Sequence, residues 1–195
     1  MKTKIFIFVL MAFCLISFRQ NTSSAQSVWS QQILSPPSGG VGYYSNIQFV
    51  NSVTGWSSGF SSNSPNTNYG VILKSTNGGN TWVWVDLGWS TQYDIGLFFL
   101  NENTGWTWTN TGLIKKTTDV GNTWTDQSIG GGSLYSITFV NDQTGYAAGY
   151  QTNNGVIRKT TNGGTNWTTV STVTSFPLRK VKFINEMTGW VSGVN

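Results

Sequence analysis

The chain has 195 residues, with 11 Lys or Arg, 7 Asp or Glu and no His, and its formal net charge is +4. Its one cysteine is Cys14, so disulfides, histidine general bases and the usual Cys/His zinc sites are excluded. Because Lys2, Lys4 and Arg19 lie within the first 25 residues, the rest of the chain is almost neutral, and a basic face for nucleic acid is excluded as well.

The first 25 residues have the pattern of a secretory signal peptide. Two lysines precede an apolar run over residues 5–18, and Ser23, Ser24 and Ala25 supply small residues before Gln26. The run is too short to span a bilayer comfortably, although an uncleaved anchor is the alternative. We therefore expect a mature chain over residues 26–195 without a membrane span. It would be secreted and lie outside the cell, at the cell surface or in the periplasm.

One eight-residue template occurs four times. The copies are FVNSVTGW (49–56), FLNENTGW (99–106), FVNDQTGY (139–146) and FINEMTGW (183–190). Short segments rich in β-branched and aromatic residues surround them, separated by Asn/Gly turns, and no sustained helical period is present. Four short strands in a repeat of about 43 residues predict an all-β fold, a β-propeller of four-stranded blades. A β-solenoid is the alternative.

The repeats divide the chain after residue 25 into blades. We expect them at about residues 44–88, 92–130 and 133–173, with a partial blade at 178–195. Residues 28–34 resemble an additional fourth strand, which would close the ring against the last blade. A blade of two strands would leave unpaired edges, so we expect the sequence to be the N-terminal part of a larger propeller.

A second motif ends the third strand of the first three repeats and finishes in Trp. Its constant positions are Ser75, Asn77, Gly79 and Trp82, then Thr117, Asp119, Gly121 and Trp124, then Thr160, Asn162, Gly164 and Trp167. Asn and Asp accept backbone N–H groups, glycine tolerates a positive φ, and Trp packs between sheets. A phosphate loop would need a Gly-Lys-Ser/Thr sequence before a helix, and calcium several carboxylates. The motif therefore predicts a hairpin corner, with no cofactor and no metal.

These motifs resemble two groups of known proteins. The Trp-ending motif resembles the Asp-box, or BNR, repeat of sialidases and related propellers. The whole unit resembles the photosystem II stability/assembly-factor propellers and their secreted bacterial relatives. The second resemblance implies a non-enzymatic scaffold that holds a protein partner. Sialidases resembling this repeat use three arginines, whereas the mature chain has Arg158 and Arg179 alone, so we expect no catalytic residues and no enzyme activity.

Positions that differ between the repeats are the candidates for partner binding. Alternation along the first strand places one such position on the same face as the template Phe. Its residues in the four repeats are Ser45, Ile95, Tyr135 and Arg179. The densest basic cluster is Arg179, Lys180 and Lys182, which would suit an acidic partner.

A carbohydrate-binding or sialidase-like propeller is the alternative function, with a glycan as the possible ligand. Three tryptophans outside the repeat positions could stack on a sugar. They are Trp84, Trp89 and Trp108.

Overall fold

The computed structural model describes residues 15–19, 28–32, 41–62, 68–89 and 95–194. Within these ranges the regular elements are sixteen β-strands, without a helix. No helix among the described residues is therefore long and apolar enough to cross a membrane.

Twelve of the strands form three antiparallel four-stranded sheets, which we call blades 1, 2 and 3. Blade 1 holds β3 (Val41–Phe49), β4 (Gly55–Ser62), β5 (Asn68–Ser75) and β6 (Val83–Val85). Blade 2 holds β7 (Ile95–Phe99), β8 (Gly105–Thr109), β9 (Leu113–Thr117) and β10 (Thr125–Ser128). Blade 3 holds β11 (Ser133–Phe139), β12 (Gly145–Gln151), β13 (Asn154–Thr160) and β14 (Thr168–Thr174). In each blade the strands pair in chain order.

Two further sheets have two strands each. Blade 4 consists of β15 (Leu178–Phe183) and β16 (Gly189–Gly193). The other sheet pairs β1 (Leu15–Arg19) with β2 (Val28–Gln32). The strand expected at residues 28–34 is thus present as β2, but it pairs with β1 rather than with the last blade. Strand β1 is close in sequence, so this pairing closes a short loop at low entropic cost.

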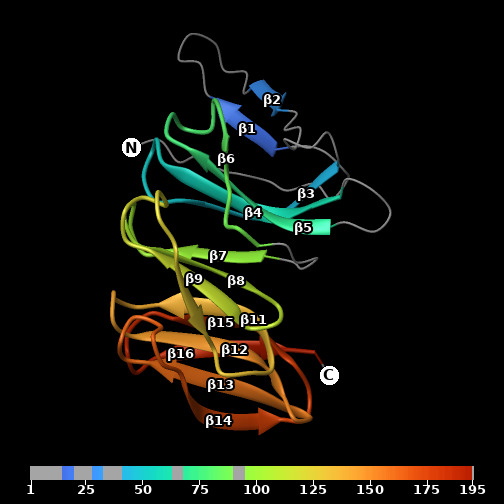
Figure 1. The fold of residues 1–195 in the computed structure, drawn as a ribbon, viewed down its shortest axis with the longest axis vertical. Helices are drawn as coiled ribbons and strands as arrows, with labels where there is room; N and C mark the ends of the chain where they lie inside the picture. The colour runs from blue at the N-terminus through green and yellow to red at the C-terminus, as the bar shows by residue number, and fades with distance from the viewer. Residues whose placement is uncertain (1–14, 20–27, 33–40, 63–67, 90–94, 195) are drawn as a thin grey trace.

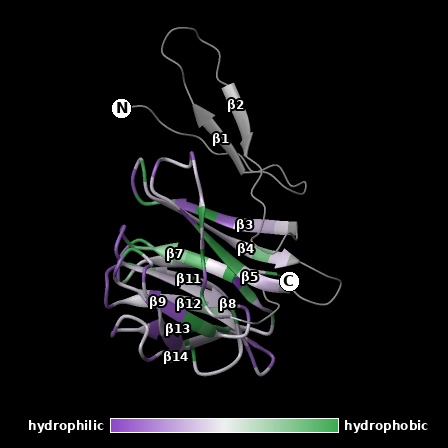
Figure 2. Cartoon of the chain, turned by 45° about the horizontal axis from the view of Figure 1, so that its top comes forward, coloured by the Kyte–Doolittle hydropathy of each residue, from purple (hydrophilic) through white to green (hydrophobic). Residues whose placement is uncertain are grey.

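Blades 1, 2 and 3 follow one another along the molecule, and blade 4 overlaps blade 3 in this view (Figure 1). The first strand of each blade contacts the first strand of the preceding blade: β7 with β3, β11 with β7, and β15 with β11. Hydrophobic residues lie along the strands of the blades, and β7 is largely hydrophobic, whereas many of the turns are hydrophilic (Figure 2). The core therefore lies between neighbouring sheets.

A stacked aromatic pair joins each blade to the next. The aromatic residue that follows the template glycine lies flat on the template Phe of the following blade. The pairs are Trp56 with Phe99 (centroids 4.2 Å apart), Trp106 with Phe139 (3.5 Å) and Tyr146 with Phe183 (3.6 Å). The rings are nearly parallel, with interplanar angles of 8°, 7° and 5°. Each blade interface therefore repeats one contact.

The template glycine makes room for the Phe of its own blade. Gly105 pairs with Phe99 across β7 and β8, and a Cβ on Gly105 would lie 2.4 Å from the Phe99 ring. The other three template glycines are equally close to their own Phe rings. The Phe ring is consequently held between a glycine of its own blade and an aromatic ring of the preceding blade.

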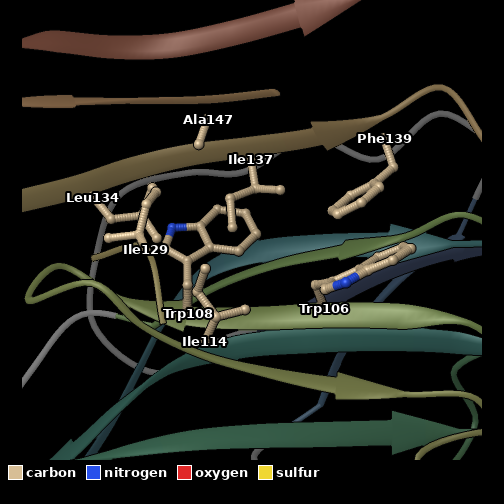
Figure 3. Close-up of a cluster of buried hydrophobic side chains, with 8 residues drawn as sticks. All are labelled: Trp106, Trp108, Ile114, Ile129, Leu134, Ile137, Phe139 and Ala147. Atoms are coloured by element: carbon tan, nitrogen blue, oxygen red, sulfur yellow. The ribbon is translucent and has the colours of Figure 1, made fainter. Parts of the chain in front are cut away.

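Apolar side chains complete each interface, as Figure 3 shows between blades 2 and 3. The buried cluster there consists of Trp106, Trp108, Ile114, Ile129, Leu134, Ile137, Phe139 and Ala147. Trp106 and Phe139 face each other, while Trp108 lies among the aliphatic side chains. Similar clusters fill the other two interfaces.

The aromatic residue after the template glycine should contribute to stability in the blades where it is stacked and contribute little where it is exposed. Trp106 is fully buried at the interface with blade 3, whereas Trp190, its equivalent in blade 4, is 62% exposed. We expect Trp106→Ala to lower the free energy of unfolding by about 3–5 kcal/mol. The matched variant Trp190→Ala should change it by less than about 0.5 kcal/mol. Urea unfolding followed by circular dichroism would measure both, and equal losses would contradict the role given to the stack.

Candidate functional site

The three Trp-ending motifs form the same hydrogen-bonded turn. In blade 2 the Thr117 hydroxyl donates to Asp119 Oδ1 (2.8 Å) and accepts from the N–H of Gly121 (2.9 Å). Asp119 accepts both the N–H (2.9 Å) and the hydroxyl (2.6 Å) of Thr123. Matching bonds within the other two turns involve Ser75, Asn77 and Gly79, and Thr160, Asn162 and Gly164. The polar side chains of the motif are thus engaged in shaping a hairpin corner.

The last residue of this motif packs on the template Phe of its own blade. The pairs are Trp82 with Phe49, Trp124 with Phe99, and Trp167 with Phe139, at centroid distances of 5.8, 6.2 and 5.9 Å. All three approach edge-on, a favourable arrangement for aromatic rings. The motif therefore contributes packing as well as a turn.

A lysine links these turns to the next blade, and the sequence reasoning did not single it out. Lys74 Nζ lies 5.1 Å from the centroid of the Trp56 ring and donates to Val120 O of blade 2 (2.6 Å). Lys116 and Lys159 lie over the corresponding rings of blades 2 and 3. Burial lowers the pKa of Lys74 and of Lys116. The available signal was a lysine at a constant three residues before the Asn or Asp of the motif.

Two template carboxylates bridge blades. Glu102 accepts a hydrogen bond from Asn51 Nδ2 (3.1 Å), and Glu186 accepts one from Asn141 Nδ2 (2.9 Å). In each case the asparagine belongs to the preceding blade, so the carboxylates contribute to blade contacts. Within the described part of the chain, no group of three or more His, Cys, Asp or Glu side chains could hold a metal ion.

The two arginines have different surroundings. Arg158 is buried, with 4% of its surface exposed, and donates to Gln151 and Thr169. Burial lowers its pKa. Arg179 is exposed and lies over the ring of Tyr135, with Cζ 4.1 Å from the ring centroid. Arg158 is therefore a structural residue, whereas Arg179 is available for binding.

Most of the candidate binding residues on the first strands lie at β-bulges. The register of β11 against β12 shifts between Leu134 and Ser136, which leaves Tyr135 as the extra residue. The register shifts in the same way in β3 and in β15, which leaves Ser45 and Arg179 as the extra residues of these strands. A bulge interrupts the alternation of side chains. These three residues therefore do not follow the face that sequence alternation assigns to them.

A glycine in the second strand accompanies each bulge. A Cβ on Gly149 would lie 2.0 Å from Ser133 O, and one on Gly59 would lie 1.7 Å from Tyr43 O. A Cβ on Gly193 of blade 4 would lie 2.5 Å from a backbone oxygen. Only a residue without a side chain lets the bulged strand come this close.

Blade 2 differs because it has Thr109 at the position of these glycines. Its first strand pairs with β8 in an unbroken register, and Ile95 lies directly opposite Thr109. Ile95 is 1% exposed and belongs to the core between blades 1 and 2. The prediction that Ile95 contacts a partner is therefore wrong, because without a bulge its side chain stays in the interface.

Four of the predicted residues come together as one candidate site. We call Tyr135, Arg179, Lys180 and Lys182 the basic–aromatic patch. The three cationic side chains are exposed and Tyr135 is half-buried. Lys182 Nζ lies 6.0 Å from the centroid of the Phe98 ring, so the patch reaches toward blade 2. In the described residues the one ion pair is Lys115–Asp126, which leaves the patch without a carboxylate partner there.

The remaining predicted residue, Ser45, lies apart in blade 1. It is exposed and accepts a hydrogen bond from its neighbour Asn46 (3.1 Å). The structure therefore does not place it with the patch.

The three tryptophans considered for sugar stacking are all partly or fully covered. Trp108 is 6% exposed and lies in the core between blades 2 and 3. Trp84 is half-buried near Tyr44, and Trp89 is half-buried with Lys115 Nζ 5.6 Å from its ring centroid. Trp108 therefore cannot offer a ring face to a sugar.

Comparison with solved structures identifies the fold. No protein-family model and no curated protein sequence matches the chain. A structure described as YCF48 bound to D1 peptide has 21% identity and a TM-score of 0.60, over 76% of this chain and 45% of that chain. YCF48 from Cyanidioschyzon merolae has 18% identity and a TM-score of 0.52, over 80% and 50%. The chain thus spans about half the length of these structures. The predicted all-β propeller fold is confirmed.

The bulge in blade 3 predicts that a side chain added at Gly149 lowers the stability of the protein. We expect Gly149→Ala to lower the free energy of unfolding by about 1–3 kcal/mol, because its Cβ would overlap the Ser133 carbonyl. The variant should also shift Tyr135 away from Arg179. Chemical denaturation would measure the first effect, and an NMR spectrum of the tyrosine ring the second. An unchanged midpoint together with an unchanged spectrum would contradict the role of the glycine.

The turn of blade 2 predicts a pH dependence of stability. Hydrogen bonds from the side chain and backbone of Thr123 lower the pKa of Asp119 to about 2. This value is below the ordinary aspartate value, so the ionised carboxylate stabilises the folded state above about pH 4. The contribution is lost as the pH falls toward 2. The unfolding temperature of Asp119→Asn should fall less between pH 5 and pH 2 than that of the parent protein. Equal falls would contradict the assignment.

Proposed function

We propose that this protein is a secreted, non-enzymatic scaffold that binds a protein partner through the basic–aromatic patch. The observation that carries the proposal is the cation–π contact of Arg179 with Tyr135, which joins blades 3 and 4 beside two further exposed lysines. No acidic side chain pairs with these cations in the described ranges. Export is supported by the signal-peptide pattern of residues 1–25.

The chemistry of the patch favours an acidic segment of a protein. The Arg179 guanidinium lies over the Tyr135 ring and is exposed, so its N–H groups can donate to the carboxylates of a partner. The lysines add positive charge that attracts acidic side chains. The neighbouring structure of YCF48 bound to D1 peptide shows that a propeller of this fold holds a peptide in that protein. We propose a peptide-binding role for this chain by analogy with that structure.

The structural use of the polar residues supports a role without catalysis. Arg158 is buried, and the Asp-box residues are hydrogen-bonded within their turns. The two carboxylates Glu102 and Glu186 accept hydrogen bonds from asparagines of neighbouring blades. A carbohydrate-binding role has less support, because Trp108 is buried in the core.

Binding of a labelled peptide would test the proposal. We would compare a fluorescent decapeptide containing four glutamates with the same peptide containing glutamines, using fluorescence anisotropy. The glutamate peptide should bind more tightly, and added salt should weaken it, because exposed charges are screened. The double variant Arg179→Gln/Lys182→Gln should weaken binding by about three- to tenfold, since exposed charge pairs contribute modestly.

Lys115→Gln is the matched control, because it removes a positive charge that already pairs with Asp126. It should leave the affinity for the glutamate peptide unchanged. Equal binding of the two peptides, or an equal loss in the control, would contradict the proposed site.

A further inference from the structure

The first strands of blades 3 and 4 are joined by a buried hydrogen bond beside the basic–aromatic patch. The hydroxyl of Ser136 in β11 accepts the N–H of Val181 in β15, at 3.2 Å. Both residues are 6% exposed. Ser136 directly follows Tyr135 in the chain, and Val181 comes two residues after Arg179. The bond therefore lies next to the bulges that carry these two residues.

The acceptor for this N–H comes from outside the sheet of blade 4. Strand β15, like the first strand of every other blade, is at the edge of its sheet. A buried backbone N–H that loses its acceptor destabilises the arrangement in which it is buried. The Ser136 hydroxyl therefore favours the placement of β15 in which Val181 can reach it.

Blade 1 makes a corresponding contact with blade 2. Asn46, which directly follows Ser45, donates from Nδ2 to Ile95 O of β7 (3.2 Å). Blade 2 has Gly96 at this position and an unbroken register in its first strand. Glycine has no side chain with which to make such a bond. In blades 1 and 3, the residue after the extra residue of the bulge thus connects its strand to the first strand of the next blade.

Buried apolar residues fix the backbone on the other side of each bulge. Leu134, before Tyr135, is 1% exposed, and Leu178, before Arg179, is 4% exposed. Each of the two patch residues thus lies between a buried leucine and the hydrogen bond that joins the strands. A cation–π contact needs the cation within about 6 Å of the ring centroid, so it depends on how the two strands are held.

We propose that Ser136 is a positioning residue of the basic–aromatic patch. Its buried hydroxyl holds β15 against β11 so that Arg179 lies over Tyr135 before an acidic partner arrives. The inference rests on the proposed function, and it adds a residue that acts on the partner through Arg179. A side chain that is already ordered loses less rotamer freedom on binding, so the affinity for the partner increases.

The NMR signals of the Arg179 side chain would test this positioning directly. Protons that lie over the face of an aromatic ring resonate upfield, and Arg179 Cζ lies 4.1 Å from the Tyr135 centroid. The Arg179 side-chain protons should be shifted upfield in the parent protein and return toward ordinary arginine values in Ser136→Ala. Tyr135→Leu, which removes the ring, should abolish the shift and so identify its source.

Thr138 provides the matched control, two residues further along β11. Alternation places it on the same face as Ser136. Its hydroxyl is buried without a hydrogen-bond partner in the described structure. Thr138→Val should therefore keep the upfield shift of Arg179, because the hydroxyl that it removes does not hold β15.

The glutamate decapeptide would test the consequence for binding. In fluorescence anisotropy, Ser136→Ala should bind it about two- to tenfold more weakly than the parent protein, the range expected for ordering one side chain. The double variant Ser136→Ala/Arg179→Gln should bind no more weakly than Arg179→Gln alone, because Ser136 acts through Arg179. Thr138→Val should bind the peptide like the parent protein.

A second control separates positioning from a general loss of stability. Ser57 is a buried serine of blade 1 whose hydroxyl donates to Asn46 O (2.9 Å). Ser57→Ala and Ser136→Ala should both lower the midpoint of urea unfolding, because each breaks a buried hydrogen bond. Only Ser136→Ala should change the Arg179 shift and the affinity for the peptide.

Three results would overturn the inference. They are an unchanged Arg179 shift in Ser136→Ala, an equal loss of affinity in Ser136→Ala and Ser57→Ala, and additive effects of Ser136→Ala and Arg179→Gln. If the parent protein and Ser136→Ala bind the glutamate peptide equally well, the positioning role fails and the proposed function stands. If the parent protein does not bind the peptide but Ser136→Ala still loses the shift, the proposed function fails and Ser136 still positions Arg179.

Discussion

The flat contact between a template Phe and the aromatic ring of the preceding blade is the interaction on which this fold depends. One face of the ring lies against a glycine of its own blade, and the other against Trp or Tyr of its neighbour. The space is narrow on both sides, so neither the glycine nor the stacked rings can change without a cost in packing. The Trp that ends the second motif packs edge-on against the template Phe. A lysine lies over the Trp or Tyr ring that follows the template glycine.

This constraint explains why so few polar residues of the repeat remain for function. In the template, Asn51 Oδ1 accepts the N–H groups of Val53 (2.9 Å) and Thr54 (2.7 Å), and so holds the turn that brings glycine under Phe. The Asp-box residues hold the second turn in the same way. Chemistry that could act on a ligand is therefore left to the positions that differ between the blades, such as Arg179.

The repeats make the propeller predictable from sequence, because their period and turn residues follow from local rules. The faces of the first strands are harder to predict, since alternation fails where a bulge adds a residue. Tyr135 and Ile95 occupy equivalent positions, yet one lies in the basic–aromatic patch and the other in the core. The signal was present in the second strand, where Gly149 permits the bulge and Thr109 does not. Its meaning depends on a close approach of two backbones that sequence alone does not show.

Blade 4 shows that the repeat is directional. Each blade offers its template aromatic to the following blade and receives one from the preceding blade. In blade 4, Phe183 receives Tyr146 and is held firmly, whereas Trp190 has no blade against it in the described residues. Trp190 therefore occupies the position that, in blades 1 to 3, stacks on the template Phe of the following blade. The same stacking rule that stabilises the fold thus defines the contact that a further blade would make with Trp190, through a Phe at its template position.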